Sequence, residues 1–373
     1  MWGEGQGRRR VVSIVGTRPE AIKMAPVGAE LSRRRRLSHE VLLTNQHACL
    51  GEAFSAEAGL VREIDYDPVG RTPADLRRSL RAQLAERLRP HRIDLVLVQG
   101  DTASAVAGAR AASDCGIPIG HVEAGLRSFD LRQPFPEEGY RMAIDAAADL
   151  LFAPTETAAD NLRRYARARG RIVVTGNSGI DALLQVRARL EPVEREESGR
   201  RLILFTCHRR ENQGRLMTAI CDSLKRLVAD LPVRVVAPLH PNRHVRRSLE
   251  QALGGTEHIE LVEPLDHEAM VRLMLRSWLI LSDSGGLQEE AAALGTPLLV
   301  LRHVTERPEA LASGNMELVG TNPARIVTTV RRLLAYPQSY FRMARPAFPF
   351  GDGRASERIA DAIEAWLVSR PPA

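Results

Sequence analysis

The sequence predicts an α/β protein made of two doubly wound, Rossmann-like domains with parallel sheets. The first observation is the length of 373 residues, which exceeds one ordinary core and suits two domains of roughly 150–200 residues. The second is a repeated alternation of short apolar strands with helical segments, which is typical of βαβ units. The third is a charged, apolar-poor segment at residues 191–199, after which the alternation starts again.

We therefore expect one domain at residues 1–190, a linker at 191–199 and a second domain at 200–355. A C-terminal helix within residues 356–373 is expected to return to the first domain. Because ligands of open parallel sheets bind beyond the carboxyl ends of the strands, the two domains should face a shared central cleft.

In the first domain, an apolar strand at residues 11–15 leads into a helix whose first turn contains Pro19. Proline suits that position because its missing N–H would have no partner there. Leucines recur every four residues in the helix predicted at 73–88, and residues 61–72 are predicted as loop. The remaining strands are predicted at 40–44, 94–99, 117–122, 150–153 and 171–175, and the remaining helices at 103–112, 134–148, 157–169 and 180–190.

The second domain repeats the same alternation. Strands are predicted at 202–206, 233–237, 259–262, 278–281, 297–301 and 316–319. Helices are predicted at 216–227, 243–253, 267–275, from 287 onward, 324–334 and about 356–369. The stretch between 301 and 316 is predicted as loop.

The composition excludes several classes of protein. Hydrophobic residues make up 44% and charged residues 26%, which is typical of a soluble globular chain. Without an apolar run of about 20 residues, or an apolar core in the first ten residues, we expect no membrane segment, no signal peptide and a cytoplasmic location. The net charge of +6 comes from dispersed arginines, and with aromatic residues at only 4% we expect no nucleic-acid partner. The four cysteines are scattered, so neither a disulfide framework nor a metal site is expected.

The segment Ser282-Asp283-Ser284-Gly285-Gly286 is the strongest local signal, because it joins an apolar strand to a helix. The first N–H groups of a helix lack intrahelical partners and favour anions, and two glycines allow phosphates to approach the backbone. We therefore predict a diphosphate site at Ser284, Gly285 and Gly286, with Glu290 one turn later as a ribose contact. The alternative is an ordinary turn in which a serine caps the helix.

Polar side chains also follow other predicted strands, at Arg18, Asp101, Glu123, His208 and His240. For each alone a structural role is the simpler explanation, and Asp101 in particular could cap the helix that follows it. Together they favour a binding site. The cationic group of Arg18, Lys23, His208 and Arg307 suits a diphosphate, whereas Asp101, Glu123 and Glu137 suit proton transfer. The dinucleotide and P-loop glycine patterns are lacking, so no cofactor is expected.

Seven motifs stand out along the chain: GTRPEAIKMAPV from Gly16, QGDTASA from Gln99, HVEAGLRS from His121, PFPEE from Pro134, HRREN from His208, DSGGLQEEAAALGTPLLVLR from Asp283 and TERPE from Thr305. Together they resemble the motifs of the non-hydrolysing UDP-N-acetylglucosamine 2-epimerases. The resemblance runs along nearly the whole chain. It implies a fold like that of the B-type glycosyltransferases, a homodimer, and reversible conversion of UDP-N-acetylglucosamine to UDP-N-acetylmannosamine.

The reaction implied by the resemblance is anti elimination of UDP, through 2-acetamidoglucal, followed by return of UDP. Asp101, Glu123 and Glu137 would then handle proton transfer and charge, without a decision as to which removes the C2 proton. His208 and Arg18 would hold the diphosphate. The other implied substrate contacts are Lys23, Arg209, Met270 (at the uracil), Ser284, Gly285, Gly286, Glu290 (at the ribose) and Arg307. A B-type glycosyltransferase, a hydrolysing epimerase and a non-catalytic sugar-nucleotide sensor are the alternatives.

This chain departs from the family pattern after Thr44, where Gln46 and His47 are followed by Ala48 and Cys49. Some members of the family bind a second substrate molecule as an activator in this region. The resemblance implies a remnant of that allosteric site at Gln46, His47, Glu138, Arg210 and His240. We hypothesise that catalysis is kept while activation by substrate is weakened or lost.

Overall fold

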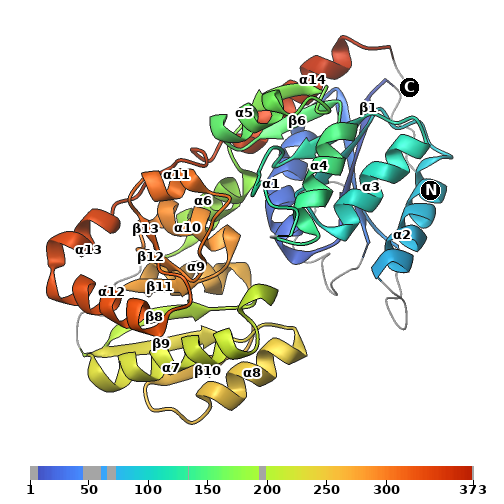
Figure 1. Ribbon diagram of the computed structural model, residues 1–373. Helices are drawn as coiled ribbons and strands as arrows, with labels where there is room; N and C mark the ends of the chain where they lie inside the picture. The colour runs from blue at the N-terminus through green and yellow to red at the C-terminus, as the bar shows by residue number, and fades with distance from the viewer. Residues whose placement is uncertain (1–6, 45–59, 65–72, 133, 193–198, 372–373) are drawn as a thin grey trace. The chain divides into compact units, whose positions relative to one another are not determined.

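The computed structural model describes residues 7–44, 60–64, 73–132, 134–192 and 199–371 (Figure 1). The chain divides into two compact units. Unit 1 consists of Met1–Ala182 with Phe350–Ala373, and unit 2 consists of Leu183–Pro349. Each unit is built around one parallel sheet.

The sheet of unit 1 has the strand order β3-β2-β1-β4-β5-β6-β7, and all its neighbouring strands are parallel. The order reverses between β1 and β4, which makes these two strands the topological switch point. The strands are β1 (Arg9–Val15), β2 (Leu37–Leu43), β3 (Leu60–Glu63), β4 (Leu95–Gln99), β5 (Ile119–Val122), β6 (Leu150–Ala153) and β7 (Arg171–Val174).

Helices cover both faces of this sheet. The helices of this part of the chain are α1 (Arg18–Arg33), α2 (Pro73–Leu88), α3 (Ala103–Asp114), α4 (Glu137–Ala147), α5 (Glu156–Arg164), α6 (Ser178–Arg189) and α14 (Ala355–Val368). Val11 and Leu95 point toward α1 and α14, whereas Val12 and Val96 point toward α2 and α3. The C-terminal helix α14 thus packs against α1, as Figure 1 shows.

Unit 2 repeats the design with the strand order β10-β9-β8-β11-β12-β13, again parallel throughout, and its switch point lies between β8 and β11. Its strands are β8 (Arg201–Thr206), β9 (Val233–Pro238), β10 (Ile259–Val262), β11 (Leu279–Ser282), β12 (Leu298–Val300) and β13 (Met316–Leu318). Its helices are the short 3-10 helix η3 (Arg210–Asn212), α7 (Arg215–Asp230), α8 (Arg243–Leu253), α9 (His267–Arg276), α10 (Gly285–Leu294), α11 (Pro308–Ala312), α12 (Pro323–Ala335) and α13 (Pro337–Met343).

The strands of both sheets are apolar on both faces because helices bury both sides, and this explains their continuous hydrophobic runs. In β4, Leu95 and Leu97 belong to one core and Val96 and Val98 to the other. In unit 2, Ile203 and Phe205 of β8 pack in a core with α7 and α12. The prediction of two doubly wound parallel-sheet domains is confirmed.

Four details of the sequence prediction are wrong. Residues 61–63 were expected as loop but belong to the edge strand β3. An edge strand needs less apolar sequence, and Arg62 pairs with Glu40 of the neighbouring strand. Helix α5 ends at Arg164, five residues early, where Tyr165 leaves the helix and stacks under Arg127. The short helices α11 and α13 were missed because a helix of five to seven residues carries little periodicity.

Most of the linker expected at 191–199 lies outside the described residues. Within the described residues, no helix is long and apolar enough to cross a membrane.

Candidate functional site

In unit 1, Glu123 directly follows β5 and its carboxylate is held by three side chains. Lys23 of α1 forms an ion pair with it at 2.6 Å, and Asn177 donates a hydrogen bond at 2.9 Å. Gln99, the last residue of β4, also donates to it. The sequence analysis placed Lys23 near an anionic ligand, whereas the structure shows that it neutralises a carboxylate 100 positions away.

The backbone of Glu123 is strained. Its φ of 67° lies in the left-handed region, which costs a residue with a Cβ of the order of 1–3 kcal/mol. The three hydrogen-bonding partners and the buried environment hold the residue in this conformation. Strain of this kind concentrates at functional sites, so Glu123 is the strongest single candidate in unit 1.

Asp101 lies two residues after β4, the strand beside β5. The Arg141 guanidinium binds its carboxylate through two nitrogens, at 2.7 and 2.6 Å. The helix-cap alternative for Asp101 is wrong, because Thr102 caps α3 by accepting the Ala105 N–H at 3.0 Å. Asp101 is therefore left for another role, paired with a cation.

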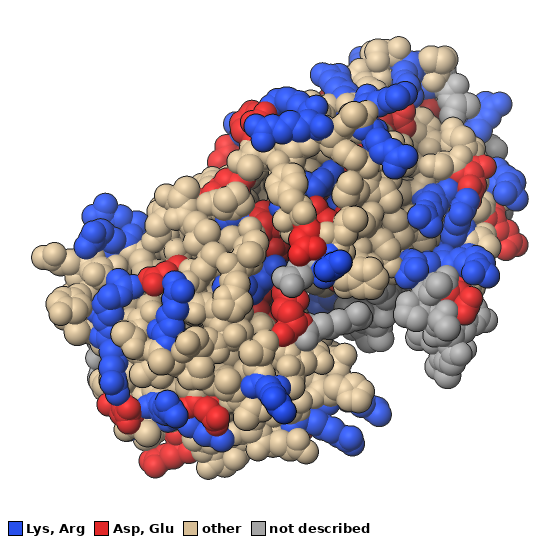
Figure 2. All heavy atoms as spheres, in the orientation of Figure 1, with Lys and Arg blue, Asp and Glu red and all other residues tan. Residues whose placement is uncertain are grey.

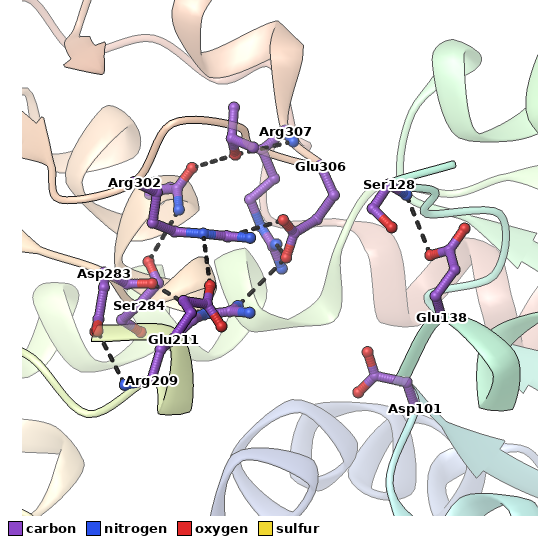
Figure 3. A network of polar contacts seen from close by, with 12 residues as sticks. Asp101, Ser128, Glu138, Arg209, Glu211, Asp283, Ser284, Arg302, Glu306 and Arg307 are labelled. Atoms are coloured by element: carbon purple, nitrogen blue, oxygen red, sulfur yellow. Dashed lines mark hydrogen bonds and ion pairs between the residues drawn. The ribbon is translucent and has the colours of Figure 1, made fainter. Parts of the chain in front are cut away.

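Glu137 and Glu138 open helix α4 and differ in what they contact. Glu138 accepts the N–H groups of Ser128 and Phe129 at 3.1 and 3.3 Å and also binds Arg141 at 3.0 Å (Figure 3). It therefore closes the loop before α4. The Oε2 atom of Glu137 is buried and has no hydrogen-bond partner among the described residues. Of this pair, Glu137 is the better candidate for a ligand contact.

Glu20 was not singled out by the sequence analysis, although it lies at the switch point of unit 1. Its carboxylate accepts the N–H groups of Gly16 and Thr17 at 3.0 and 2.7 Å and the Thr102 hydroxyl at 2.6 Å, so it joins the starts of α1 and α3. Burial raises the pKa of Glu20 to about 7, against the lowering effect of these hydrogen bonds. Arg18, predicted as a diphosphate contact, opens the same helix and is half-buried.

In unit 2, Asp283 organises the loop that follows β8. It is fully buried and accepts the backbone N–H groups of His208 at 3.1 Å and Arg209 at 2.9 Å, as well as the Asn212 amide at 2.9 Å. The Cys207 thiol donates to it at 3.2 Å. The loop with the HRREN motif is thus attached to the end of β11, at the switch point of this sheet.

His208 lies at this loop with its ring stacked on that of His240, at 5.0 Å between centroids and 8° between planes. Burial lowers the pKa of His208, although Asp283 opposes the shift. The sequence analysis counted His208 among the cations. The lowered pKa works against that assignment, because it disfavours the charged imidazole.

The predicted phosphate turn opens helix α10. Ser284 is the N-cap residue, but its side chain makes no cap hydrogen bond, so the simple capping alternative does not account for it. The Arg307 guanidinium packs on Gly285, where an added Cβ would lie 2.6 Å from Nη1. Gly286 has open space at the same position. The turn therefore brings together the Ser284 hydroxyl, the first N–H groups of α10 and a guanidinium.

Arg307 belongs to a network of buried charges around Glu306 that the sequence did not reveal. Glu306 accepts from Arg209, Arg302 and Arg307 at 3.3, 2.8 and 2.9 Å, and Arg307 also binds Glu289 at 2.5 Å (Figure 3). Arg302 and Arg307 are 7% and 6% exposed. Arg302 also lies 3.5 Å from Glu211, so the three guanidinium groups are matched by three carboxylates and form a network of ion pairs beside the turn.

The other predicted residues have fewer contacts that define a role. Glu290 is half-buried on α10 and lies 3.7 Å from His267, the first residue of α9; Met270 follows one turn later on that helix. Gln46 and His47 lie outside the described residues, as does the side chain of Arg210. The space-filling view shows the many arginine and lysine side chains spread over the surface of both units (Figure 2).

Two glycine substitutions test the phosphate turn. Gly286→Ala adds a methyl group in open space, so we expect the unfolding free energy to change by less than about 1 kcal/mol, while UDP binding weakens roughly tenfold or more because the backbone loses its close approach. Gly285→Ala should displace Arg307 and reduce both stability and binding. Calorimetry with UDP and thermal unfolding of both variants check this. Unchanged UDP affinity in both would contradict the predicted site.

Both units carry their polar residues at the carboxyl ends of the switch-point strands, which is where doubly wound α/β proteins bind nucleotides. The fold and these sites define a nucleotide-binding α/β protein of this class. The sequence model of the family described as UDP-N-acetylglucosamine 2-epimerase matches residues 29–364. The chain belongs to this family.

Individual relatives agree along the whole chain. The UDP-N-acetylglucosamine 2-epimerase of Escherichia coli K12 is 40% identical over 376 residues, with 96% of this chain and 100% of that protein covered. The Bacillus subtilis enzyme is 39% identical over 359 residues, with 95% and 94% covered. The crystal structure of the Neisseria meningitidis epimerase bound to UDP-GlcNAc has a TM-score of 0.91 at 36% identity, covering 95% of this chain and 100% of that one. An S. aureus structure with UDP has a TM-score of 0.87 at 37% identity, covering 98% and 99%.

Proposed function

We propose that the protein interconverts UDP-N-acetylglucosamine and UDP-N-acetylmannosamine without net hydrolysis. The observation that carries the proposal is the family match along nearly the whole chain, together with Asp101 and Glu123 held by cations at the ends of adjacent strands. The similar Neisseria protein binds UDP-GlcNAc. For this chain, the same sugar nucleotide is the proposed substrate.

The proposed reaction begins with removal of the C2 proton by a carboxylate of unit 1. As this C–H bond breaks, its electrons form the C1–C2 double bond and the C1–O bond breaks, which releases UDP as an anion and leaves 2-acetamidoglucal. UDP then adds back to C1, and a proton reaches C2 from the opposite face. Asp101, Glu123 and Glu137 supply this acid–base chemistry and stabilise charge at the ring.

The UDP contacts implied by the family motifs are kept as part of the proposal. Arg18 and the turn at Ser284, Gly285 and Gly286 bind the diphosphate through donors, with His208 as a further hydrogen-bond partner. Arg209 and Arg307 supply guanidinium donors at the same turn, and Lys23 orients Glu123. Glu290 binds the ribose and Met270 packs on the uracil. No cofactor or metal takes part in the proposed mechanism.

We further propose that the protein is a homodimer in which the activating site has lost strength, with Gln46, His47, Glu138, Arg210 and His240 as its remnant. Glu138 already uses its carboxylate within unit 1, which supports this reading. A hyperbolic dependence of rate on UDP-N-acetylglucosamine is expected. A sigmoidal curve, or a reverse reaction that needs this sugar nucleotide, would contradict the proposal.

Proton NMR of the protein with UDP-N-acetylglucosamine in deuterium oxide tests the function directly. The expected result is a mixture of the two UDP-sugars, both carrying deuterium at C2. Free N-acetylmannosamine with UDP would identify a hydrolysing enzyme, and an unchanged substrate would identify a transferase or a sensor. Either outcome overturns the proposal.

A further inference from the structure

A buried histidine lies behind the two candidate carboxylates of unit 1. His121 is on β5, two residues before Glu123, and its side chain is 0% exposed. Its Nδ1 atom lies 2.6 Å from the Asp145 carboxylate on α4. Its Nε2 atom lies 2.8 Å from the carbonyl oxygen of Gly100, the residue before Asp101. The ring therefore bridges α4 and the end of β4.

Both ring nitrogens of His121 face atoms that only accept hydrogen bonds here. A carbonyl oxygen has no proton to donate. The Arg127 guanidinium donates to the second oxygen of Asp145, and together with His121 it holds the pKa of Asp145 below its usual range, against the opposing effect of burial. Each ring nitrogen thus lies within hydrogen-bond distance of an acceptor oxygen, and the two contacts together require a donor at Nδ1 and another at Nε2.

The contact of His121 with Gly100 lies at a tight turn of the chain. The Gly100 φ of +67° turns the chain sharply after β4, and its N–H group donates to the Val122 carbonyl at 3.0 Å. His121 holds the opposite side of the residue through its carbonyl. The next two residues are Asp101, bound by Arg141, and Thr102, whose hydroxyl binds Glu20. The backbone just before Asp101 is therefore held by the contact between the Gly100 carbonyl and His121.

We propose that His121 is a positioning residue: a buried imidazolium, held by Asp145 and Arg127, that fixes the Gly100 carbonyl and so sets the place of Asp101. This rests on the proposed function, because the place of Asp101 has a measurable consequence only if the carboxylate acts on substrate. A hydrogen bond with a charged donor is about twice as strong as a neutral one, which suits it to holding a tight turn in place. The groups facing the ring are Asp145 and the Gly100 carbonyl, with Arg127 beyond Asp145.

Two substitutions separate the two contacts of the ring. In His121→Gln the amide nitrogen replaces Nε2 and can still donate to Gly100. In His121→Asn the amide nitrogen replaces Nδ1 and reaches only Asp145. We expect His121→Asn to lower kcat by about 10²-fold with little change in KM, since a misplacement of about 1 Å costs that much. His121→Gln should retain several times more activity. His39→Asn serves as the matched control. His39 is a buried histidine on β2 whose ring contacts Ser13 of β1, so its replacement should leave kcat unchanged.

The wild-type protein gives an independent test that needs no turnover. Nitrogen-15 NMR in neutral buffer should show both ring nitrogens of His121 carrying protons, with the signal assigned by its loss from the variants. A ring with one unprotonated nitrogen overturns the proposal, as does equal loss of kcat in the Gln and Asn variants. If wild-type protein shows no epimerisation in deuterium oxide, the proposed function fails, while the spectrum still decides the charge of His121.

Discussion

Replacement of Glu123 by glutamine is expected to lower the turnover number for epimerisation by about 10²–10⁴-fold, the range that general acid–base groups contribute. Glutamine keeps the shape of the side chain and its contacts with Asn177 and Lys23 in part, but it cannot take or hold a proton at C2. The loss should therefore appear in kcat, and incorporation of solvent deuterium at C2 should fall by the same factor. NMR time courses with UDP-N-acetylglucosamine measure both quantities.

Glu40→Gln provides the control for this experiment. Glu40 is also a buried carboxylate of unit 1 and also pairs with cations, Arg10 at 3.3 Å and Arg62 at 3.4 Å, but it lies on β2 away from the carboxyl ends of β4 and β5. Its substitution should cost stability and leave kcat near that of the wild type. If Glu123→Gln behaves in the same way, Glu123 is a structural residue, and the assignment of the C2 chemistry to it is wrong.

The order of strands and helices could be predicted from the sequence because it depends on the local pattern of apolar and polar residues. Buried parallel strands read as short apolar runs, such as residues 95–99, and the helices between them show periodic leucines or small residues. Elements with weak local pattern were the ones missed. The edge strand β3 contains Arg62 and Glu63, and α11 has only five residues.

The candidate site was accessible only as a set of residues at strand ends. Their partners were not, because those contacts join positions far apart in the chain. Lys23 meets Glu123 across 100 positions, and Asp283 gathers N–H groups from a loop 74 and 75 positions before it. Glu20 completes a capping box with Thr17 whose spacing is visible in the sequence, whereas residues such as Glu306 and Asp145 have no local signature of their role. Their importance follows from burial and pairing, which only the folded chain defines.

Asp283→Asn is expected to produce the largest loss of stability in unit 2. The carboxylate accepts hydrogen bonds from two backbone N–H groups of the His208–Arg209 segment and from Asn212, and hydrogen bonds to a charged group each contribute about 1.5–3 kcal/mol. In the asparagine variant the NH2 group, which only donates, would face these same donor groups. We expect the free energy of unfolding to fall by about 3 kcal/mol or more. Hydrogen exchange measured by mass spectrometry should show the lost protection around β8 and β11, with the strands of unit 1 unchanged.

The pH dependence of this effect has a definite sign. Burial alone would raise the pKa of Asp283, but His208 and the hydrogen bonds from Arg209, Cys207 and Asn212 outweigh it and hold the pKa below its ordinary value. The stabilisation by the carboxylate is therefore complete above the pKa of the unfolded chain, about 3.9, and is lost as the pH falls through the lower pKa of the folded protein. Urea unfolding of wild type and variant should accordingly converge in acid. Asp222→Asn, on the exposed surface of α7, is the control and should match the wild type at every pH. If the difference in unfolding free energy between wild type and Asp283→Asn stays constant into acid, the loop is held by packing and not by the charge of Asp283.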